Sequence, residues 1–115
     1  MSLTLYHNPR CSKSRAALAL LEEKQANFEL FLYLETPPNT DELAKIVELL
    51  GLPSARGMMR KGEAAYKDLG LADIDCEASL IAAMCEHPKL IERPILIAQN
   101  AAAIGRPTAN LLALL

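Results

Sequence analysis

Residues 3–24 read LTLYHNPRCSKSRAALALLEEK, a β-forming run that passes through a short loop into a helix-forming run. The run LTLY is apolar, β-branched or aromatic, which predicts a strand over 3–6. Over residues 12–24 the apolar residues have helical spacing and the segment ends in charged residues, which predicts a helix. A cysteine, Cys11, therefore stands at the junction between a strand and the start of a helix.

The remaining segments predict further strands and helices of ordinary length. Three more strands are expected, over 27–33, 93–98 and 101–105. Helices are expected over 41–50, near 54–60 and 63–69, over 76–86 and over 108–115. Thr40 and Asp75 stand where N-caps are expected, and Gly51 stands where the helix over 41–50 should end.

The order β-α-β, then a helical block, then β-β-α has a topological consequence. A β-α-β unit crosses over right-handed and makes its two strands parallel neighbours, and the later hairpin adds to the same sheet. We therefore expect a single α/β domain over 1–115 with a thioredoxin-like fold and a helical insertion at about 40–90. Cys11 would then lie at the carboxyl end of the first strand, where open α/β sheets bind ligands.

Composition narrows the class of protein. The chain has 115 residues, of which 51% are hydrophobic and 4% aromatic, and its net charge is −2. Disorder, nucleic-acid binding and general attraction to anionic membranes are therefore not expected. No apolar run is long enough to span a membrane, and the N-terminus does not resemble a signal peptide. Three cysteines form neither a disulfide framework nor a metal site, which favours a reducing compartment, the cytoplasm.

Cys11 is predicted to be a reactive thiolate. The unpaired N–H groups and the positive dipole at a helix start both stabilise a thiolate, as do nearby cations, here Arg10, Lys13 and Arg15. His7 lies in the same loop and would add a further positive charge. The alternative is a small buried apolar residue, the usual role of a free cysteine, but a polar and basic loop is a poor place to bury one.

The other cysteines are not paired with Cys11. Ser14 falls where a C-x-x-C oxidoreductase carries its second cysteine, so no resolving thiol is adjacent. The Ser14 hydroxyl is expected to donate a hydrogen bond to the thiolate or to a ligand, or to be an ordinary first-turn serine. Cys76 and Cys85 are predicted to be packing residues.

Three arginines stand at the edges of predicted elements. Arg60 follows Gly57-Met58-Met59, Arg93 directly precedes Pro94 and a strand, and Arg106 follows the next strand. A guanidinium binds a tetrahedral oxyanion through two parallel, charge-assisted hydrogen bonds, which a lysine does not match. From the residues alone, three solvated or salt-bridged arginines remain the alternative.

Five ordered segments together resemble the arsenate reductase (ArsC) family that is coupled to glutathione and glutaredoxin. They are YHNPRCSKS (6–14), YLETPP (33–38), RGMMRKGE (56–63), HPKLIERPILI (87–97) and IGRP (104–107). The resemblance covers nearly the whole chain. Two features resemble the shorter ArsC-related branch of this family. They are Ser12 and Lys13 directly after the cysteine, and the end of the sequence soon after Arg106.

The resemblance implies a role for each of these residues. Cys11 would attack arsenate and form a thiol–arsenic adduct. The oxyanion would be held by three arginines: Arg60, Arg93 and Arg106. His7 and Ser14 match positions thought to support the thiolate, and Arg93–Pro94 matches the cis-proline position of thioredoxin-like folds.

The resemblance also implies the partners of the reaction. Glutathione would attack the adduct as a co-substrate, arsenite would leave, and glutaredoxin would resolve the mixed disulfide. No bound metal or organic cofactor is implied.

Two other functions remain open. The chain could be a monothiol reductase or transferase that acts on another oxyanion or on mixed disulfides, because the same cysteine would serve. It could instead be a regulator like the Spx proteins, which share this fold and bind RNA polymerase without catalysis. Spx proteins typically carry a C-x-x-C switch, and the sequence CSKS (11–14) lacks the second cysteine.

Overall fold

The structure is a computed structural model, and it describes residues 3–115. The chain divides into two compact units. The sheet unit comprises the chain up to Thr36 together with Arg93–Leu115, and the helical unit comprises Pro37–Glu92. Each unit is described by itself below, and the expected single domain over 1–115 stays a prediction.

In its described residues the sheet unit contains four short strands, which lie within the predicted ranges. They are β1 Thr4–Tyr6, β2 Glu29–Phe31, β3 Ile95–Ile97 and β4 Ala102–Ile104. The strand order is β2-β1-β3-β4. β1 is parallel to β2 and antiparallel to β3, and β3 is antiparallel to β4. The predicted β-α-β unit and the later hairpin are confirmed, and the fold is thioredoxin-like.

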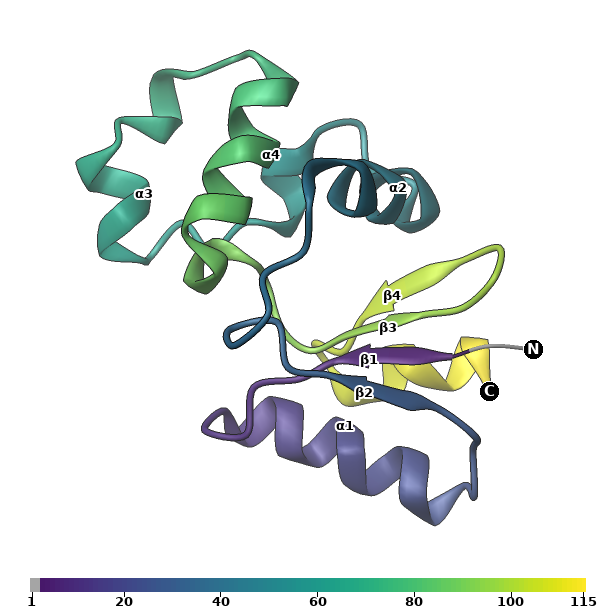
Figure 1. Cartoon of the computed structure of the whole chain (residues 1–115). Helices are drawn as coiled ribbons and strands as arrows, with labels where there is room; N and C mark the ends of the chain where they lie inside the picture. The colour runs from purple at the N-terminus through teal and green to yellow at the C-terminus, as the bar shows by residue number, and fades with distance from the viewer. Residues whose placement is uncertain (1–2) are drawn as a thin grey trace. The chain divides into compact units, whose positions relative to one another are not determined.

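One face of this sheet carries the core of the sheet unit. Leu5 pairs with Leu96 on the neighbouring strand β3, so the two side chains share a face. Helix α1 (Ser12–Glu23) and the 3₁₀ helix η4 (Thr108–Leu114) cover that face (Figure 1). The fully buried members of this core are Leu5, Ala17, Leu21, Leu96 and Leu111.

Helix α1 begins where the sequence predicts. Ser12 is its first residue, and Cys11 occupies the N-cap position with extended backbone. The residues that α1 buries are Ser14, Ala17 and Leu21, which recur every three to four positions on one face. The closing segment of the chain, predicted as a helix over 108–115, is a 3₁₀ helix instead.

The helical unit contains three α-helices and three short 3₁₀ helices. They are α2 Thr40–Leu50, η1 Ala55–Met58, α3 Ala64–Asp68, η2 Leu71–Asp73, α4 Glu77–Glu86 and η3 Pro88–Leu90. The α-helices follow the predicted segments, whereas η2 and η3 were not predicted. Each spans only three residues, too few for a periodic pattern to appear in the sequence.

Two predicted N-caps are wrong. Asn39, not Thr40, caps α2, because its side-chain oxygen accepts a hydrogen bond from the Glu42 backbone N–H at 2.8 Å. Cys76, not Asp75, occupies the N-cap position of α4, without a capping side-chain bond. The predicted end of α2 is confirmed, since Gly51 has a φ of +69°, which glycine adopts without strain.

Two side chains fasten the loops of the helical unit. The Arg56 guanidinium donates hydrogen bonds to the Tyr66 hydroxyl at 2.7 Å and to the carbonyls of Leu71 and Ile74. The Glu77 carboxylate accepts hydrogen bonds from the Ser54 hydroxyl and the Ala55 N–H. These contacts make Arg56 a structural residue within its own unit.

The packing role predicted for Cys76 is wrong. Its side chain is exposed, because α4 begins at the next residue and its cap position faces solvent, whereas Cys85 is partly buried. A free cysteine near the start of a helix packs only where that end of the helix is covered.

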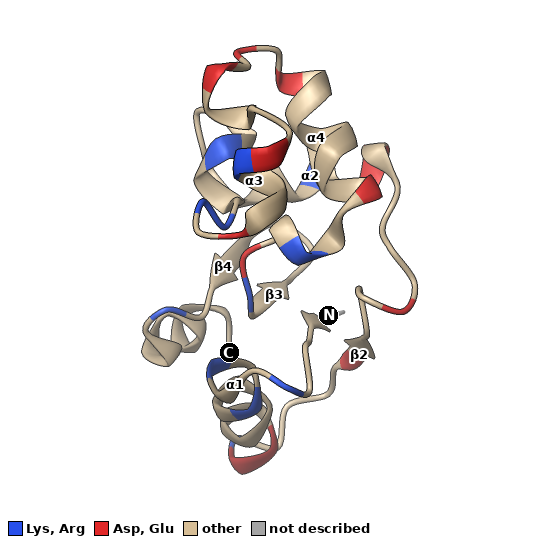
Figure 2. Ribbon diagram, turned by 90° about the vertical axis from the view of Figure 1, so that its left-hand side faces the viewer, with Lys and Arg blue, Asp and Glu red and all other residues tan. Residues whose placement is uncertain are grey.

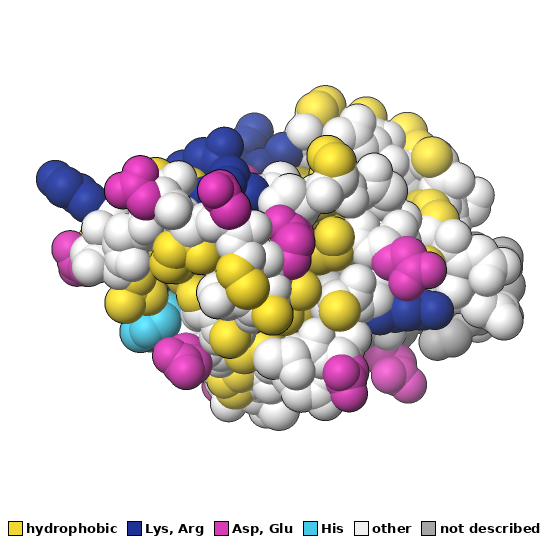
Figure 3. Space-filling view, turned by 90° about the horizontal axis from the view of Figure 1, so that it is seen from above, with side chains coloured by type: hydrophobic (Ala, Val, Ile, Leu, Met, Phe, Trp, Pro, Cys, Tyr) yellow, Lys and Arg dark blue, Asp and Glu magenta, His cyan; other side chains and the backbone are white. Residues whose placement is uncertain are grey.

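The surface agrees with the composition. The face drawn in Figure 3 carries acidic side chains spread among hydrophobic ones, and most of the basic side chains in view gather at one edge while another lies apart from them. No helix within residues 3–115 is long and apolar enough to cross a membrane.

Candidate active site

Cys11 lies in the sheet unit, where the chain leaves β1 and enters α1. Its backbone N–H donates to the Asn8 carbonyl at 3.0 Å, and its own carbonyl accepts from the Arg15 N–H at 2.9 Å. The residue is 8% exposed. The loop and the first turn of α1 therefore hold the thiol in one place at the carboxyl end of β1, with limited access to solvent.

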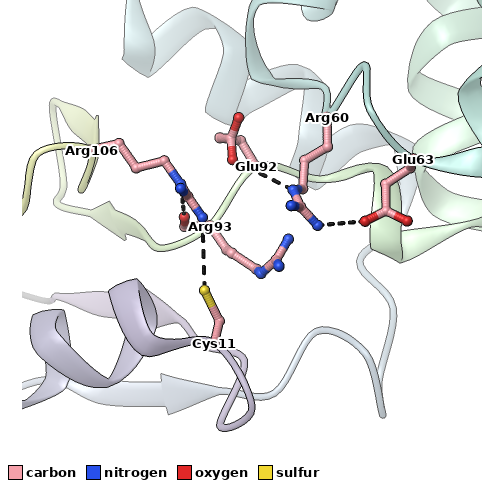
Figure 4. A network of polar contacts seen from close by, with 6 residues as sticks. All are labelled: Cys11, Arg60, Glu63, Glu92, Arg93 and Arg106. Carbon is pink, nitrogen blue, oxygen red and sulfur yellow. Dashed lines mark hydrogen bonds and ion pairs between the residues drawn. The ribbon is translucent and has the colours of Figure 1, made fainter.

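Two arginines of the sheet unit contact this thiol. Arg106 Nη2 lies 3.7 Å from Cys11 Sγ, and Arg106 Nε donates to the Arg93 carbonyl oxygen at 2.7 Å (Figure 4). The Arg93 side chain also makes a hydrogen bond to the thiol. Within this unit the structure therefore brings Arg93 and Arg106 together at the start of α1.

The β3–β4 hairpin explains why residues 13 positions apart meet. Ile95 pairs with Ile104, so the residues just outside this pair, Pro94 and Gly105, lie opposite each other. The Gly105 N–H donates to the Pro94 carbonyl at 2.9 Å. A Cβ atom on Gly105 would lie 2.8 Å from Pro94 Cγ, so this approach needs glycine. The peptide bonds Arg93–Pro94 and Arg106–Pro107 are both cis.

The surroundings of Cys11 favour its thiolate form. Burial raises the pKa of the Cys11 thiol, but hydrogen bonds from the Ser14 N–H, the Arg93 side chain and the Lys13 N–H lower it. The positive charge of Arg93 lowers it further, and the resulting pKa lies below the usual value for cysteine. At neutral pH this thiol therefore has a larger thiolate fraction than an ordinary cysteine.

Basic residues lie on the loop that leads into α1 and on α1 itself (Figure 2). Arg10, Lys13 and Arg15 are all exposed. Arg15 Nη1 donates to the Pro9 carbonyl at 3.0 Å, which ties the side chain back to the loop. The loop therefore has a backbone that is held by hydrogen bonds and carries exposed, positively charged side chains.

His7 and Ser14 support the loop in a way that differs from the prediction. Ser14 Oγ lies 2.6 Å from His7 Nδ1 and accepts the Asn8 N–H at 2.9 Å, so the hydroxyl fastens the loop to α1. The contribution of Ser14 to Cys11 comes from its backbone N–H. The Ser14 hydroxyl is therefore not the predicted donor to the thiolate.

His7 does not supply the predicted positive charge. Burial lowers the pKa of His7, a hydrogen bond to the Ser14 backbone raises it, and the charge of Arg15 lowers it again. The resulting pKa lies below the usual value for histidine, so the imidazole is mainly neutral at pH 7.

Arg60 lies in the helical unit, where two carboxylates accompany it. Arg60 Nη1 lies 2.5 Å from Glu63 Oε1, and Arg60 Nε lies 3.8 Å from Glu92 Oε1 (Figure 4). An antiparallel bridge between Met59 and Ile91 brings the Arg60 and Glu92 segments together. Arg60 therefore forms ion pairs in this structure, which is one of the alternatives that the sequence left open for these arginines.

Within residues 3–115 there is no cluster of three or more His, Cys, Asp or Glu side chains placed to hold a metal ion.

Comparison with known proteins identifies the family. The model of the ArsC family matches residues 6–114. This chain belongs to the ArsC family.

Similar ArsC proteins match over nearly the whole chain. A protein named arsenate reductase from Neisseria meningitidis is 52% identical, and the match covers 98% of this chain and 97% of that protein. A protein of the same name from Haemophilus influenzae is 46% identical, and the match covers 100% of this chain and 100% of that protein. The solved structure of an arsenate reductase from Vibrio cholerae has a TM-score of 0.96 at 48% identity, covering 100% of this chain and 98% of that one.

The unpaired backbone N–H groups predicted at the helix start are those of Lys13 and Ser14, in the first turn of α1. The two carboxylates beside Arg60 in the helical unit were not found from the sequence. Glu63 could have been expected, because it lies three residues after Arg60. Glu92 had no local signal, because it meets Arg60 only through the pairing of Met59 with Ile91.

Proposed function

We propose that this chain reduces arsenate to arsenite through a covalent adduct on Cys11. The observation that carries the proposal is a thiol of lowered pKa in contact with two arginines at the start of α1. Such a site combines a nucleophile with cations that hold a tetrahedral oxyanion. Family membership and the names of the relatives support arsenate as that oxyanion.

The first step is attack of the Cys11 thiolate on arsenic. A sulfur–arsenic bond forms, one arsenic–oxygen bond breaks, and that oxygen leaves as water after protonation. Arg93 and Arg106 bind the remaining oxyanion charge, which grows as the attacking sulfur donates its electrons. Arg60 is proposed as a third oxyanion ligand on the basis of the family resemblance.

The second step transfers two electrons to arsenic. A glutathione thiolate attacks the Cys11 sulfur, a Cys11–glutathione disulfide forms, and the electron pair of the sulfur–arsenic bond goes to arsenic, which leaves as arsenite. A glutaredoxin thiol then attacks the glutathione sulfur and releases the Cys11 thiolate. No resolving cysteine is required near Cys11, which agrees with Ser14 at the C-x-x-C position.

The test is arsenite production from arsenate with glutathione, glutaredoxin and an NADPH recycling system. Wild type should turn over, and Cys11→Ser should reduce the rate to background. Cys76→Ser is the matched control, because this exposed thiol lies in the helical unit and should be dispensable. Turnover by Cys11→Ser equal to wild type would refute the mechanism.

A second candidate shares the same residues. Guanidinium groups bind phosphate and sulfate by the same geometry as arsenate, so a reductase or transferase for another oxyanion or for mixed disulfides needs no other site. Protection of Cys11 from alkylation separates the two. Protection by oxyanions without arsenite production would favour another oxyanion substrate, and indifference to all of them would favour mixed disulfides.

A further inference from the structure

A cavity beside the Cys11 loop has no part in the mechanism described so far. It lies entirely within the sheet unit and has a volume of about 290 Å³. One wall is the loop His7–Arg10, and the other is the segment that follows β2, including Leu32, Leu34 and Glu35. The parallel pairing of β1 with β2 places the two segments at the same edge of the sheet (Figure 1).

Both walls of the cavity are held by hydrogen bonds that backbone N–H groups donate. The His7 N–H donates to the Phe31 carbonyl at 3.0 Å, which joins the two walls at their base. The Arg10 N–H donates to Asn8 Oδ1 at 3.0 Å, and the Glu35 N–H donates to the Leu32 carbonyl at 3.0 Å. The cavity is therefore already formed before a ligand binds. This lowers the free-energy cost of binding, because no segment has to become ordered.

The chemistry of the walls is that of a site for a small zwitterion. Leu32 and Leu34 are partly buried and supply apolar surface, whereas Arg10 and Glu35 are exposed and oppositely charged. Within residues 3–115 neither of these two charged side chains makes a hydrogen bond or an ion pair. A cation and an anion on opposite walls select a molecule that carries both a carboxylate and an ammonium group.

The position of the cavity relates it to Cys11. Arg10 directly precedes Cys11, and consecutive Cα atoms are only about 3.8 Å apart. We propose that this cavity binds a peptide thiol through its carboxylate and ammonium groups, glutathione in the proposed reaction. This inference rests on the proposed function, because that function requires glutathione to reach the Cys11 sulfur. At about 290 Å³ the cavity holds one end of a tripeptide and leaves its thiol free.

Reaction of reduced enzyme with glutathione disulfide tests the site without arsenate. The Cys11 thiolate attacks one sulfur of the disulfide, a Cys11–glutathione disulfide forms, and one glutathione thiolate leaves. The second-order rate constant is measured by mass spectrometry, in parallel with that for bis(2-hydroxyethyl) disulfide, which is uncharged.

The variants are Arg10→Glu and Glu35→Lys, with Lys24→Glu and Glu23→Lys as exposed charge-matched controls at the far end of α1. Each cavity variant should lower the rate constant for glutathione disulfide about fivefold more than the rate constant for the uncharged disulfide, which registers any effect of the changed charge on Cys11 itself. The controls should match wild type with both. S-methylglutathione, which lacks a thiol, should slow the wild-type reaction at lower concentrations than it slows the reaction of Arg10→Glu.

Unchanged rates of both cavity variants with glutathione disulfide would overturn the inference. Equal slowing with both disulfides would also overturn it, because the change would then act on Cys11 itself. Neither result bears on arsenate reduction. Conversely, the enzyme could fail to produce arsenite and still react with glutathione disulfide in a charge-dependent way. That result would refute arsenate as the substrate and would support the glutathione site.

Discussion

The two units of the molecule surround their arginines with different groups. In the sheet unit, Arg106 contacts the Cys11 sulfur and Arg93 forms a hydrogen bond to it, so the cations favour an anionic thiolate. In the helical unit, Arg60 faces the carboxylates of Glu63 and Glu92. The same side chain therefore lowers the pKa of a nucleophile in one unit and is neutralised in the other. The neighbours of an arginine, not its position beside a motif, determine its electrostatic effect.

The largest effect is expected from Arg93→Ala. The pKa of Cys11 should rise towards its usual value, because one hydrogen bond and one positive charge are lost. The rate of alkylation by iodoacetamide should therefore reach its plateau at higher pH than in wild type. The apparent affinity for arsenate, measured by protection against alkylation, should fall roughly a hundredfold, since a charged hydrogen bond contributes about 2–3 kcal/mol.

Arg93→Lys is the control for charge alone. The positive charge of the lysine should still lower the pKa of Cys11, but bidentate binding of the oxyanion should be lost. An Arg93→Ala variant with the alkylation profile of wild type would remove the contrast between the two units.

The next largest effect is expected from Ser14→Ala, and it concerns stability. Removing the hydroxyl leaves His7 Nδ1 and the Asn8 N–H without this partner, which should lower the free energy of unfolding by about 1–3 kcal/mol. The pKa of Cys11 should stay close to that of wild type, because the Ser14 N–H remains. Denaturant unfolding and alkylation against pH measure the two effects separately.

Ser12→Ala is the matched control for this variant, since Ser12 is exposed on the same turn of α1. It should change neither quantity. A Ser14→Ala variant that raised the Cys11 pKa without loss of stability would restore the hydroxyl as donor to the thiolate.

A smaller effect is expected from Glu63→Gln in the helical unit. If Arg60 binds the oxyanion as proposed, loss of the competing carboxylate should raise the apparent affinity for arsenate about threefold, as for a partly exposed ion pair. In an Arg60→Ala background the same change should have no effect. Glu48→Gln, an exposed change on α2, is the control. Weaker binding by Glu63→Gln would mean that the carboxylate positions Arg60.

The smallest effect is expected from the titration of His7. Because its pKa is lower in the folded protein, the unfolded chain binds more protons in acid, and stability must fall as pH decreases. The contribution of neutral His7 to the free energy of unfolding is fully present above the unfolded pKa of about 6.5. It is lost as pH falls through the pKa of His7 in the folded protein. His7→Gln should lessen the loss of stability between pH 7 and pH 5 relative to wild type. A pH dependence equal to that of wild type would contradict a buried neutral His7.

Local sequence was sufficient for the framework of the site. Helix α1 begins at Ser12 as expected, because periodicity and the charged end of the segment mark a helix without reference to the rest of the chain. The position of Cys11 against free N–H groups follows from that boundary alone. The β-α-β order and the later hairpin also followed from local patterns, since crossover handedness leaves few topologies.

Tertiary structure decided the contacts that tune the site. The Ser14 hydroxyl meets His7 and Asn8, and His7 loses its charge, because burial depends on how the loop packs against its neighbours. Glu92 reaches Arg60 only because Met59 pairs with Ile91, far away in the chain. Periodicity and capping act between residues a few positions apart and can be read from the sequence. Burial and charge pairing depend on residues that only the folded chain brings together.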